Sequence, residues 1–309
     1  MLLIMTLAAV MLGVSAWQAP AQVHSLNVVG YYNVTLVRGW NLLANQLIQG
    51  NFNANHVLPL GPPDGSLLYR FDPATQNYYD AGTYIAGLGW YPLSGNTNDS
   101  VLNLLPGESF FIWTPETWIA TFVGGVAQGT LINPLPANYS LKSSMVPQPG
   151  LLTTVLGFPP YPGDLVWRRI APAPTFSAYA YDDVGMQWTP SEPNLSVGEG
   201  FFLYRAPAQA TPGHYWIRNF TVQFAPSPPP GPKTAAVTAG ASSAARIRSL
   251  SFKNGNAVLV IQTVGEGPYN VQFSLDRVSW TTIAVGQTAA LWQEPARGGV
   301  QGYYQLVNP

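Results

Sequence analysis

The sequence GESFFIW at residues 107–113 recurs as GEGFFLY at residues 198–204. In both copies a Gly-Glu pair is followed, after one small residue, by four large apolar residues. Successive side chains of an extended strand point to opposite faces, so both faces of each strand are apolar. Such a strand is typical of the interior of a sheet that is covered on both sides. We therefore expect these two segments to be central, buried strands.

The segments around this motif are duplicated in the same order. Residues 39–42, 65–70 and 118–122 recur at 138–141, 163–168 and 216–220, with offsets of 98 or 99 residues. The offset falls to 91 at the Gly-Glu motif, because the first copy has seven extra residues before Gly107 and the second has seven after Tyr204. A period of this length indicates a duplicated domain, since solenoid repeats are much shorter. Residues 39–123 and 138–222 are therefore expected to share one β topology.

The local patterns within each copy are those of strands and turns. Residues 67–71 and 78–84 flank the segment 72–77, whose Asp-Pro start suits a type I turn, so they predict a β-hairpin. Proline recurs too often for long helices, and only residues 51–58 could hold a short helical turn. The expected fold class is all-β, with two tandem homologous β-domains that are either sandwiches or barrels.

The first residues predict export. Residues 2–14 are almost wholly apolar, and the small residues Ala19 and Ala21 stand at the two positions that a signal peptidase reads. We expect a signal peptide at residues 1–21, although no Lys or Arg precedes the apolar run. The alternative is a buried N-terminal strand or helix. A transmembrane span is less expected, because the run is shorter than the roughly 20 residues that cross a bilayer. The mature protein is expected to be secreted, extracellular or at the cell surface, without membrane insertion.

The composition changes after the second copy. Residues 226–245 are rich in Pro, Ala and Ser, which is typical of a linker. Residues 246–309 contain several strand-like segments, including a hairpin at 274–280 with Trp280 in its core, and predict a small immunoglobulin- or fibronectin-like sandwich. The two copies are then expected to span residues 22–127 and 128–225. Because the linker holds few apolar residues, we expect the C-terminal unit to move independently.

Charge and composition exclude several functional classes. Charged residues make up only 9% of the 309 residues, and 13 Lys+Arg against 14 Asp+Glu give a net charge of -1. A nucleic-acid-binding protein needs a basic face, which this balance does not supply. The lack of cysteine excludes disulfides, thiolate metal sites and cysteine nucleophiles. His24, His56 and His214 lie in unlike contexts without metal-ligand spacing, so we expect neither a metal nor another cofactor.

Two features resemble a known group of proteins. They are residues 28–47, with VVGYYNVTL followed by GWNLLANQL, and the two Gly-Glu-x-Phe-Phe motifs. Over residues 27–224 the chain is similar to uncharacterised, duplicated, secreted β-proteins of environmental Gram-negative bacteria. YNVQ at 269–272 and SWT at 279–281 resemble an immunoglobulin- or fibronectin-like β-module that is often appended to such exported proteins. The resemblance implies the compartment and the architecture, and it implies no activity.

Glu108 and Glu199 hold matching positions in the two copies, and they admit two interpretations. A pair of carboxylates about 5–9.5 Å apart can hydrolyse a glycosidic bond. Alternatively, each glutamate accepts backbone N–H bonds in a turn ahead of a buried strand. We favour this structural interpretation, because a residue needed twice in the same local context is explained by local structure. The sequence also lacks the recognisable catalytic motifs, and we expect no catalytic residue.

Binding candidates come from the aromatic residues, which make up 13% of the chain. Exposed Tyr and Trp can stack on sugar rings, although aromatic residues equally fill the cores of small β-domains. In adjacent pairs such as Tyr31-Tyr32 and Tyr78-Tyr79, one ring faces outward unless both faces of the strand are covered. The loop 91–100 is present in one copy only, and loops on rigid scaffolds usually carry recognition. The predicted ligand-binding residues are Tyr78, Tyr91, Asn96, Asn98 and Asp99.

These observations predict a secreted, non-enzymatic structural or adhesive protein of the cell surface or extracellular matrix. The alternative is a glycan-binding protein, and the further alternative is an extracellular polysaccharide hydrolase that uses Glu108 and Glu199. The expected partner is an extracellular glycan or a surface protein, and no nucleic acid is expected.

Overall fold

The computed structural model describes residues 28–58, 60–95, 99–169, 175–207, 214–222, 245–253, 256–262, 268–295 and 301–307. Of Asp99, Ser100, Phe252 and Lys253 it describes the backbone alone. The expected signal peptide at 1–21 and residues 226–244 of the expected linker lie outside these ranges, so both stay predictions.

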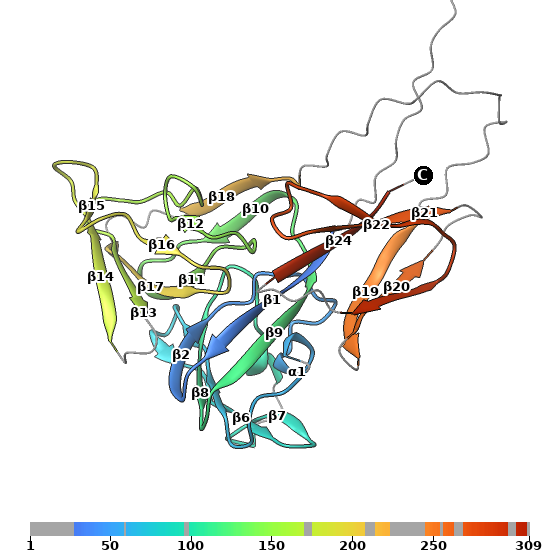
Figure 1. Cartoon of the computed structure of the whole chain (residues 1–309). Coiled ribbons are helices and arrows are strands. Elements are labelled where there is room, and N and C mark those ends of the chain that lie inside the picture. Colours follow the sequence, from blue (N-terminus) through green and yellow to red (C-terminus); the bar gives the residue numbers. More distant parts are fainter. Residues whose placement is uncertain are drawn as a thin grey trace, which may run out of the picture.

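The described part of the chain is nearly all β, as the sequence predicts (Figure 1). Its helical elements are one turn of α-helix, α1 (Ala54–Val57), and a short 3-10 helix, η1 (Asp99–Leu102). The helix α1 falls within residues 51–58, and the Asn53 side chain caps it by accepting a hydrogen bond from the Asn55 amide at 3.0 Å. Neither of these helices has the length and apolar character needed to cross a membrane.

Two five-stranded antiparallel sheets form the body of the two copies, and their strand orders correspond (Figure 1). The first has the order β2 (Gly39–Leu43), β8 (Phe110–Thr114), β3 (Leu67–Tyr69), β6 (Gly82–Ile85) and β7 (Gly89–Pro92). The second has the order β11 (Asn138–Ser143), β17 (Gly200–Arg205), β13 (Leu165–Arg169), β14 (Phe176–Tyr181) and β15 (Trp188–Thr189). The Gly-Glu-x-Phe-Phe strands β8 and β17 are hydrogen-bonded on both sides, and Phe110, Phe111 and Phe201 are buried, as expected. Phe202 and Tyr204 are only partly buried, so one face of β17 is less covered than expected.

Each copy adds a pair of strands that flank its sheet. These pairs are β1 (Val29–Leu36) with β9 (Trp118–Gly125), and β10 (Gly129–Pro134) with β18 (Tyr215–Phe220). Two short pairs are β4 (Phe71–Asp72) with β5 (Asn77–Tyr78), which is the hairpin predicted around residues 72–77, and β12 (Gly150–Leu151) with β16 (Asn194–Leu195). Each copy has its own apolar core, which contains Trp90 and Phe110 in the first copy and Trp188 and Phe201 in the second.

The two sheets meet through the turns that carry the Gly-Glu pairs. Leu43, at the end of β2, forms an antiparallel bridge with Glu199, which lies just before β17. Lys142 holds the equivalent place in β11 and forms the matching bridge with Glu108, just before β8. The contact between the copies is therefore reciprocal, because the Gly-Glu turn of each copy pairs with a strand of the other copy.

Backbone hydrogen bonds continue this reciprocal contact. The Ala44 amide donates to the Gly198 carbonyl at 2.9 Å, and the Ser143 amide donates to the Gly107 carbonyl at 3.0 Å. A small apolar cluster fills the space between the two sheets beside these bonds. Its members are Leu42, Tyr69, Phe71, Phe111, Leu141 and Phe202.

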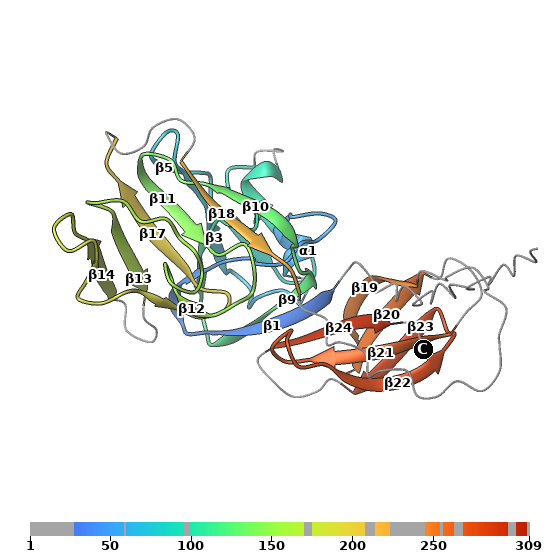
Figure 2. The same ribbon diagram turned by 90° about the horizontal axis from the view of Figure 1, so that it is seen from above.

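The C-terminal unit consists of two sheets around one core. One sheet has the order β19 (Arg246–Lys253), β20 (Asn256–Gln262) and β23 (Leu291–Pro295). The other contains β21 (Tyr269–Ser274), β22 (Thr281–Gln287) and β24 (Gln301–Val307). Strand β24 pairs with β1 as well as with β21, which gives the continuous order β22-β21-β24-β1-β9 (Figure 2).

This pairing contradicts the expectation that the C-terminal unit moves independently. Tyr31 of β1 lies in the core of the C-terminal unit, whereas Tyr303 of β24 lies in the core of the first copy. The half-buried Trp280 also packs against the core of the first copy, while its Nε1 donates to the Arg277 carbonyl within the hairpin at 3.3 Å. Tyr31 and Tyr32 are both buried because both faces of β1 are covered. The linker composition misleads here, because the unit is attached by backbone pairing between β24 and β1.

Gly30 of β1 tests this attachment, because it lies opposite Tyr303. A Cβ atom at Gly30 would lie 2.3 Å from Tyr303 Cδ1 and 2.8 Å from the Gly302 carbonyl oxygen. We expect Gly30→Ala to lower the free energy of unfolding by about 1–3 kcal/mol, because β24 must shift. Gly50→Ala is the control, since a Cβ there meets nothing within 4 Å. Chemical denaturation of both variants measures the difference, and equal stabilities would contradict the attachment through β1.

Candidate functional site

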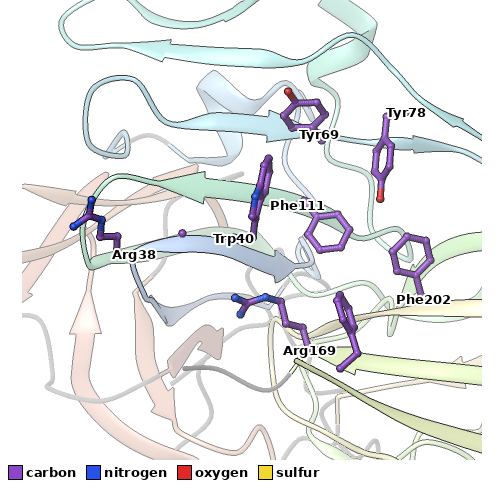
Figure 3. A pocket seen from close by; sticks show the side chains of 9 residues that line it. Arg38, Trp40, Tyr69, Tyr78, Phe111, Arg169 and Phe202 are labelled. Atoms are coloured by element: carbon purple, nitrogen blue, oxygen red, sulfur yellow. The ribbon is translucent and has the colours of Figure 1, made fainter. Parts of the chain in front are cut away.

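A cleft of about 790 Å³ lies between the two copies (Figure 3). Its lining consists of Arg38, Gly39, Trp40, Tyr69, Tyr78, Phe111, Arg169, Phe176 and Phe202. Six of these residues are aromatic, two are arginines, and none is acidic. Because both sheets contribute residues, this aromatic cleft exists only where the two copies are packed together.

Phe111 lies at the centre of the aromatic cleft. Its ring centroid is 5.8 Å from that of Phe202, 6.3 Å from those of Trp40 and Tyr78, and 6.5 Å from that of Phe176. Phe111 is buried, whereas Trp40, Tyr78 and Phe176 are 42%, 47% and 44% exposed. The contacts of Phe111 with these three rings are edge-to-face, a geometry that aromatic pairs favour. Phe111 and Phe202 thus form the floor of the cleft, and the three exposed rings form its walls.

The duplication places aromatic rings in equivalent positions on both sheets. In the first copy Trp40 of β2 lies 5.4 Å from Tyr69 of β3, between ring centroids. In the second copy the equivalent residues, Tyr139 and Trp167, lie 5.9 Å apart. In each sheet, the two strands on either side of the central strand β8 or β17 therefore carry aromatic rings on the same face. The floor of the cleft is formed where the two sets of rings approach each other.

The hairpin β4–β5 brings Tyr78 to the cleft. Asp72 fixes the turn, because its carboxylate accepts a hydrogen bond from the Ala74 amide at 2.9 Å. Gln76 then bonds across the junction to Tyr139 of β11. Its Nε2 donates to the Tyr139 carbonyl, and its Oε1 accepts from the Tyr139 amide, both at 3.0 Å. The hairpin of the first copy is thus anchored on the second sheet.

The five predicted ligand-binding residues do not come together in one pocket. Tyr78 lines the aromatic cleft. Tyr91 is exposed on β7, at the opposite edge of the first sheet from β2, and it is not part of the cleft lining. Asn96 and Asn98 lie outside the described residues, and Asp99 begins η1 with only its backbone described. The role of the loop 91–100 therefore stays a prediction.

Trp40, Arg169 and Phe176 are cleft residues that the sequence analysis does not single out. A signal for two of them is present in the duplication, because Trp40 matches Tyr139 and Tyr78 matches Phe176. An aromatic residue in both copies, at a position where strand alternation points away from the core, marks a shared aromatic face. That this face lines a cleft depends on the packing of the two copies, which no local pattern reveals.

Arg38 and Arg169 give the cleft a positive character. Figure 3 shows Arg169 on the opposite side of the central rings from Tyr69. Burial lowers the pKa of Arg169, which nevertheless stays protonated as arginines do in proteins. In the other copy, the positions of Arg38 and Arg169 are held by Ala137 and Phe71. Neither positive charge is therefore required by the backbone fold that the copies share.

Glu108 and Glu199 lie outside the cleft lining, and each forms an ion pair within its own copy. Arg70 donates to Glu108 at 2.9 Å. Arg168 donates to Glu199 through two nitrogens, at 2.7 and 2.9 Å. Glu199 also accepts from the Ser196 amide at 2.8 Å. Glu199 thus accepts a backbone N–H bond in its turn, as expected, whereas the hydrogen bond found for the Glu108 carboxylate comes from a side chain, that of Arg70.

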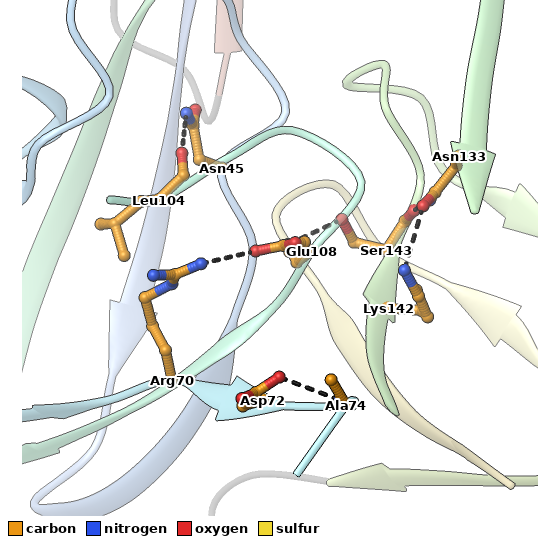
Figure 4. Close-up of polar contacts among 9 residues, drawn as sticks. All are labelled: Asn45, Arg70, Asp72, Ala74, Leu104, Glu108, Asn133, Lys142 and Ser143. Carbon is orange, nitrogen blue, oxygen red and sulfur yellow. Dashed lines mark hydrogen bonds and ion pairs between the residues drawn. The ribbon is translucent and has the colours of Figure 1, made fainter. Parts of the chain in front are cut away.

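Lys142 is a buried cation at the junction between the copies (Figure 4). It is 5% exposed, and its ammonium group donates to the Asn133 side-chain oxygen at 3.3 Å. Burial lowers the pKa of Lys142 to about 8, and the charge of Glu108 opposes that shift. The first copy has Leu43 in the equivalent position. The second copy therefore carries a charge where an apolar residue serves in the first.

The described residues contain no group of three His, Asp or Glu side chains placed to hold a metal ion. The ring of His214 lies 5.0 Å from that of Tyr161, His56 lies at the end of α1, and His24 is outside the described residues.

Comparison of the chain with protein-family models, with curated proteins and with solved structures found no match. The aromatic cleft is therefore interpreted from its own chemistry, which consists of aromatic faces and guanidinium groups.

We expect Glu199→Gln to destabilise the protein more than Glu108→Gln. The Glu199 side chain is 14% exposed and doubly bonded to Arg168, whereas that of Glu108 is 41% exposed and singly bonded to Arg70. Loss of the more buried pair should cost about 2–3 kcal/mol, and loss of the exposed pair less than about 1 kcal/mol. Chemical denaturation measures both values. If both variants are as stable as the wild type, the two glutamates have no structural role.

Lys142→Leu, which copies Leu43, is expected to stabilise the protein at pH 7. The folded-state pKa of Lys142, about 8, lies below its usual value of 10.5, so the unfolded chain binds more protons between these values. The stability of the wild type with respect to this group therefore rises with pH across that window. A shift of this size corresponds to about 3 kcal/mol, which is the gain expected at pH 7.

Denaturation of both proteins from pH 7 to about 10.5 checks this prediction, because the gain should shrink over that range. The difference between the two proteins cancels the titration of all groups that they share. A gain that does not change with pH would mean that the Lys142→Leu substitution acts through packing alone and that the buried charge of Lys142 has little cost.

Proposed function

We propose that the protein is an exported, non-enzymatic adhesive protein that attaches to an acidic extracellular polysaccharide through the aromatic cleft. One observation carries this proposal. Three half-exposed rings, those of Trp40, Tyr78 and Phe176, surround a buried aromatic floor, with two arginines and no carboxylate in the lining. The volume of about 790 Å³ falls within the range of roughly 300–1,000 Å³ that is usual for ligand sites.

Aromatic walls suit a sugar ring, because the C–H face of the sugar is apolar and can stack on a π-face. Each aromatic ring that a ligand covers contributes on the order of 1 kcal/mol through its buried area. Trp40 and Phe176 belong to different copies, so a bound polysaccharide contacts both sheets. Stacking of this kind needs no reactive group and fits attachment rather than turnover.

The two arginines favour an acidic polysaccharide over a neutral one. A guanidinium group binds a carboxylate or sulfate through two parallel hydrogen bonds. Arg38 and Arg169 are additions to the shared fold, since the other copy has Ala137 and Phe71 in their places. The whole chain has a net charge of -1, so the positive character of the cleft is a local property.

The finer architecture and the export of the protein belong to the same proposal. The matching strand orders of the two sheets support two tandem homologous β-domains. The two sheets that share the C-terminal core support an immunoglobulin- or fibronectin-like module. The signal-peptide pattern at 1–21 and the resemblance to duplicated secreted β-proteins support export to the cell surface or matrix.

The hydrolase alternative has less support. Hydrolysis of a polysaccharide needs a positioned acid together with a base or a nucleophile. Glu108 and Glu199 are outside the cleft lining, and both are engaged by arginines. The proposed function therefore assigns the cleft to binding.

Binding to alginate, an acidic polysaccharide, tests the proposed site. Trp40→Ala and Phe176→Ala should each weaken binding about tenfold, because each removes a stacking ring worth on the order of 1.4 kcal/mol. Tyr91→Ala is the matched control, since Tyr91 is 45% exposed and lies outside the cleft lining. Affinity electrophoresis of the full chain measures these effects. A loss confined to Tyr91→Ala would place the site at the loop 91–100.

Arg169→Gln separates recognition of the acid from stacking. It should weaken binding to alginate and reduce the dependence of that binding on salt, while binding to a neutral glucan stays unchanged. If the wild-type protein binds a neutral glucan and not alginate, the proposed preference for acidic polysaccharides is wrong, but the proposal that the cleft binds a polysaccharide is kept. If it binds neither, the proposed function itself is wrong.

A further inference from the structure

A second group of cations lies where the C-terminal unit meets the second copy. Arg277 sits in the turn between β21 and β22, and Arg218 lies in β18. The guanidinium carbon of Arg277 is 5.1 Å from the ring centroid of Phe220 and 5.2 Å from that of Tyr303. The guanidinium carbon of Arg218 is 5.2 Å from the same Phe220 ring. One aromatic ring therefore contacts two cations that come from different parts of the fold.

The turn that presents Arg277 is fixed by its own hydrogen bonds. Ser274 Oγ accepts from the Arg277 amide at 2.8 Å, and the Asp276 carboxylate accepts from the amides of Val278 and Ser279 at 2.8 and 2.7 Å. The bond from the Ser279 amide contributes most to lowering the pKa of Asp276 to about 2. Arg277 has a φ of 65°, a conformation that a residue other than glycine adopts only when its surroundings hold it there.

Three nitrogens of the two guanidinium groups lack a hydrogen-bond acceptor among the described residues. Arg277 is 6% exposed, and its Nε and Nη1 are buried without a hydrogen-bond partner among the described residues. The same holds for Nη1 of Arg218, whose Nη2 donates to the Gln148 side chain. None of the ion pairs found in the described ranges includes either arginine. Asp276, the neighbour of Arg277, uses one carboxylate oxygen for the turn itself.

Burial makes this arrangement unfavourable for the protein alone. Burial lowers the pKa of both guanidinium groups, and the charge of Arg277 lowers that of Arg218 further. The charges of Tyr303 and Asp276 oppose the shift of Arg277 in part. Arginine nevertheless stays charged in proteins, so the two positive charges persist and repel each other. The ring of Phe220 offsets only part of this cost, because a cation–π contact satisfies no N–H group. An anion that accepts from both guanidinium groups would satisfy an unpaired donor on each and offset the repulsion between them.

We propose that Arg218 and Arg277 bind a tetrahedral oxyanion, sulfate or phosphate, beside Phe220. Such an ion carries up to two negative charges, which match the two guanidinium groups. The Nε–H and Nη1–H bonds of Arg277 point away from each other, so one ion accepts from one of these two nitrogens and from Nη1 of Arg218. Tetrahedral oxygens suit donors that approach from two such directions better than a planar carboxylate does. None of these residues lines the aromatic cleft, so this site is independent of the proposed function.

The oxyanion site links two parts of the fold. Arg218 belongs to the second copy, and Arg277 belongs to the C-terminal unit. At the same junction the Tyr303 hydroxyl donates to the carbonyl of Pro147 at 3.1 Å. A bound oxyanion thus holds the C-terminal unit against the second copy, while β24 holds it to the first copy. Because the site exists only in the folded protein, binding stabilises the fold by mass action.

Thermal unfolding of the full chain tests this proposal. Sodium sulfate or phosphate is added up to ~20 mM, with the ionic strength held constant by sodium chloride. The melting temperature of the wild type should rise by at least about 2 °C and then level off. Arg277→Met and Arg218→Met should lose this rise. Arg248→Gln, which removes an exposed charge on β19, should keep it.

Calorimetric titration with sulfate should give one ion per chain for the wild type and for Arg248→Gln, and none for Arg218→Met. If Arg277→Met does not fold, Arg218→Met carries the test, because that side chain is only partly buried. Sulfated dextran at the same sulfate concentration distinguishes a sulfate ester from the free ion, and an Arg218-dependent rise with either supports the site. A rise that is linear in sulfate and equal in all variants is the general effect of a kosmotropic salt, and it overturns the proposal.

Discussion

The reciprocal exchange of the two Gly-Glu turns is the contact on which the rest of the arrangement depends. The turn ahead of β8 bridges to Lys142, and the turn ahead of β17 bridges to Leu43, so each turn is held by the other copy. The approach is so close that a Cβ at Gly200 would lie 2.1 Å from the Cβ of its equivalent, Ser109. Only one of these two positions can therefore carry a side chain. This closeness brings the central phenylalanines of β8 and β17 into contact, and the aromatic cleft lies over that contact.

The backbone pairing tolerates large differences in the polar interior of the two copies. The second copy has a buried ion pair in which Arg205 bonds both oxygens of Asp164, at 3.0 and 2.6 Å. The first copy has Ser66 and Thr114 in the equivalent places, and each bonds a backbone carbonyl instead. Because one strand order accommodates both solutions, the fold rests on strand pairing and on apolar positions rather than on a particular ion pair. The buried charge of Lys142, where the first copy has Leu43, is a second such difference.

Local pattern predicts the local structure of this chain well. Alternation and turn residues lead to the central strands, the hairpin around residues 72–77 and the helical turn within 51–58. The docking of the C-terminal unit could not be predicted in this way, because it joins β1 to β24 at the far end of the chain. The cleft has the same limitation, since Trp40 and Phe176 meet only after the copies pack. Tyr78 is found because adjacent tyrosines expose one ring, and Tyr91 shows that exposure alone does not make a pocket.

Comparison of the two copies separates what the fold needs from what a ligand needs. Arg70 and Arg168 are equivalent, and each pairs with the equivalent glutamate, Glu108 or Glu199, of its own turn. A contact built twice from the same residues belongs to the shared fold. Arg169 has no such counterpart, because Phe71 takes its place and serves the same backbone equally well. The fold does not need a charge that is present in one copy and absent from the other, so such a charge can serve recognition. Arg169 and Arg38 carry two such charges, and both line the cleft between the copies.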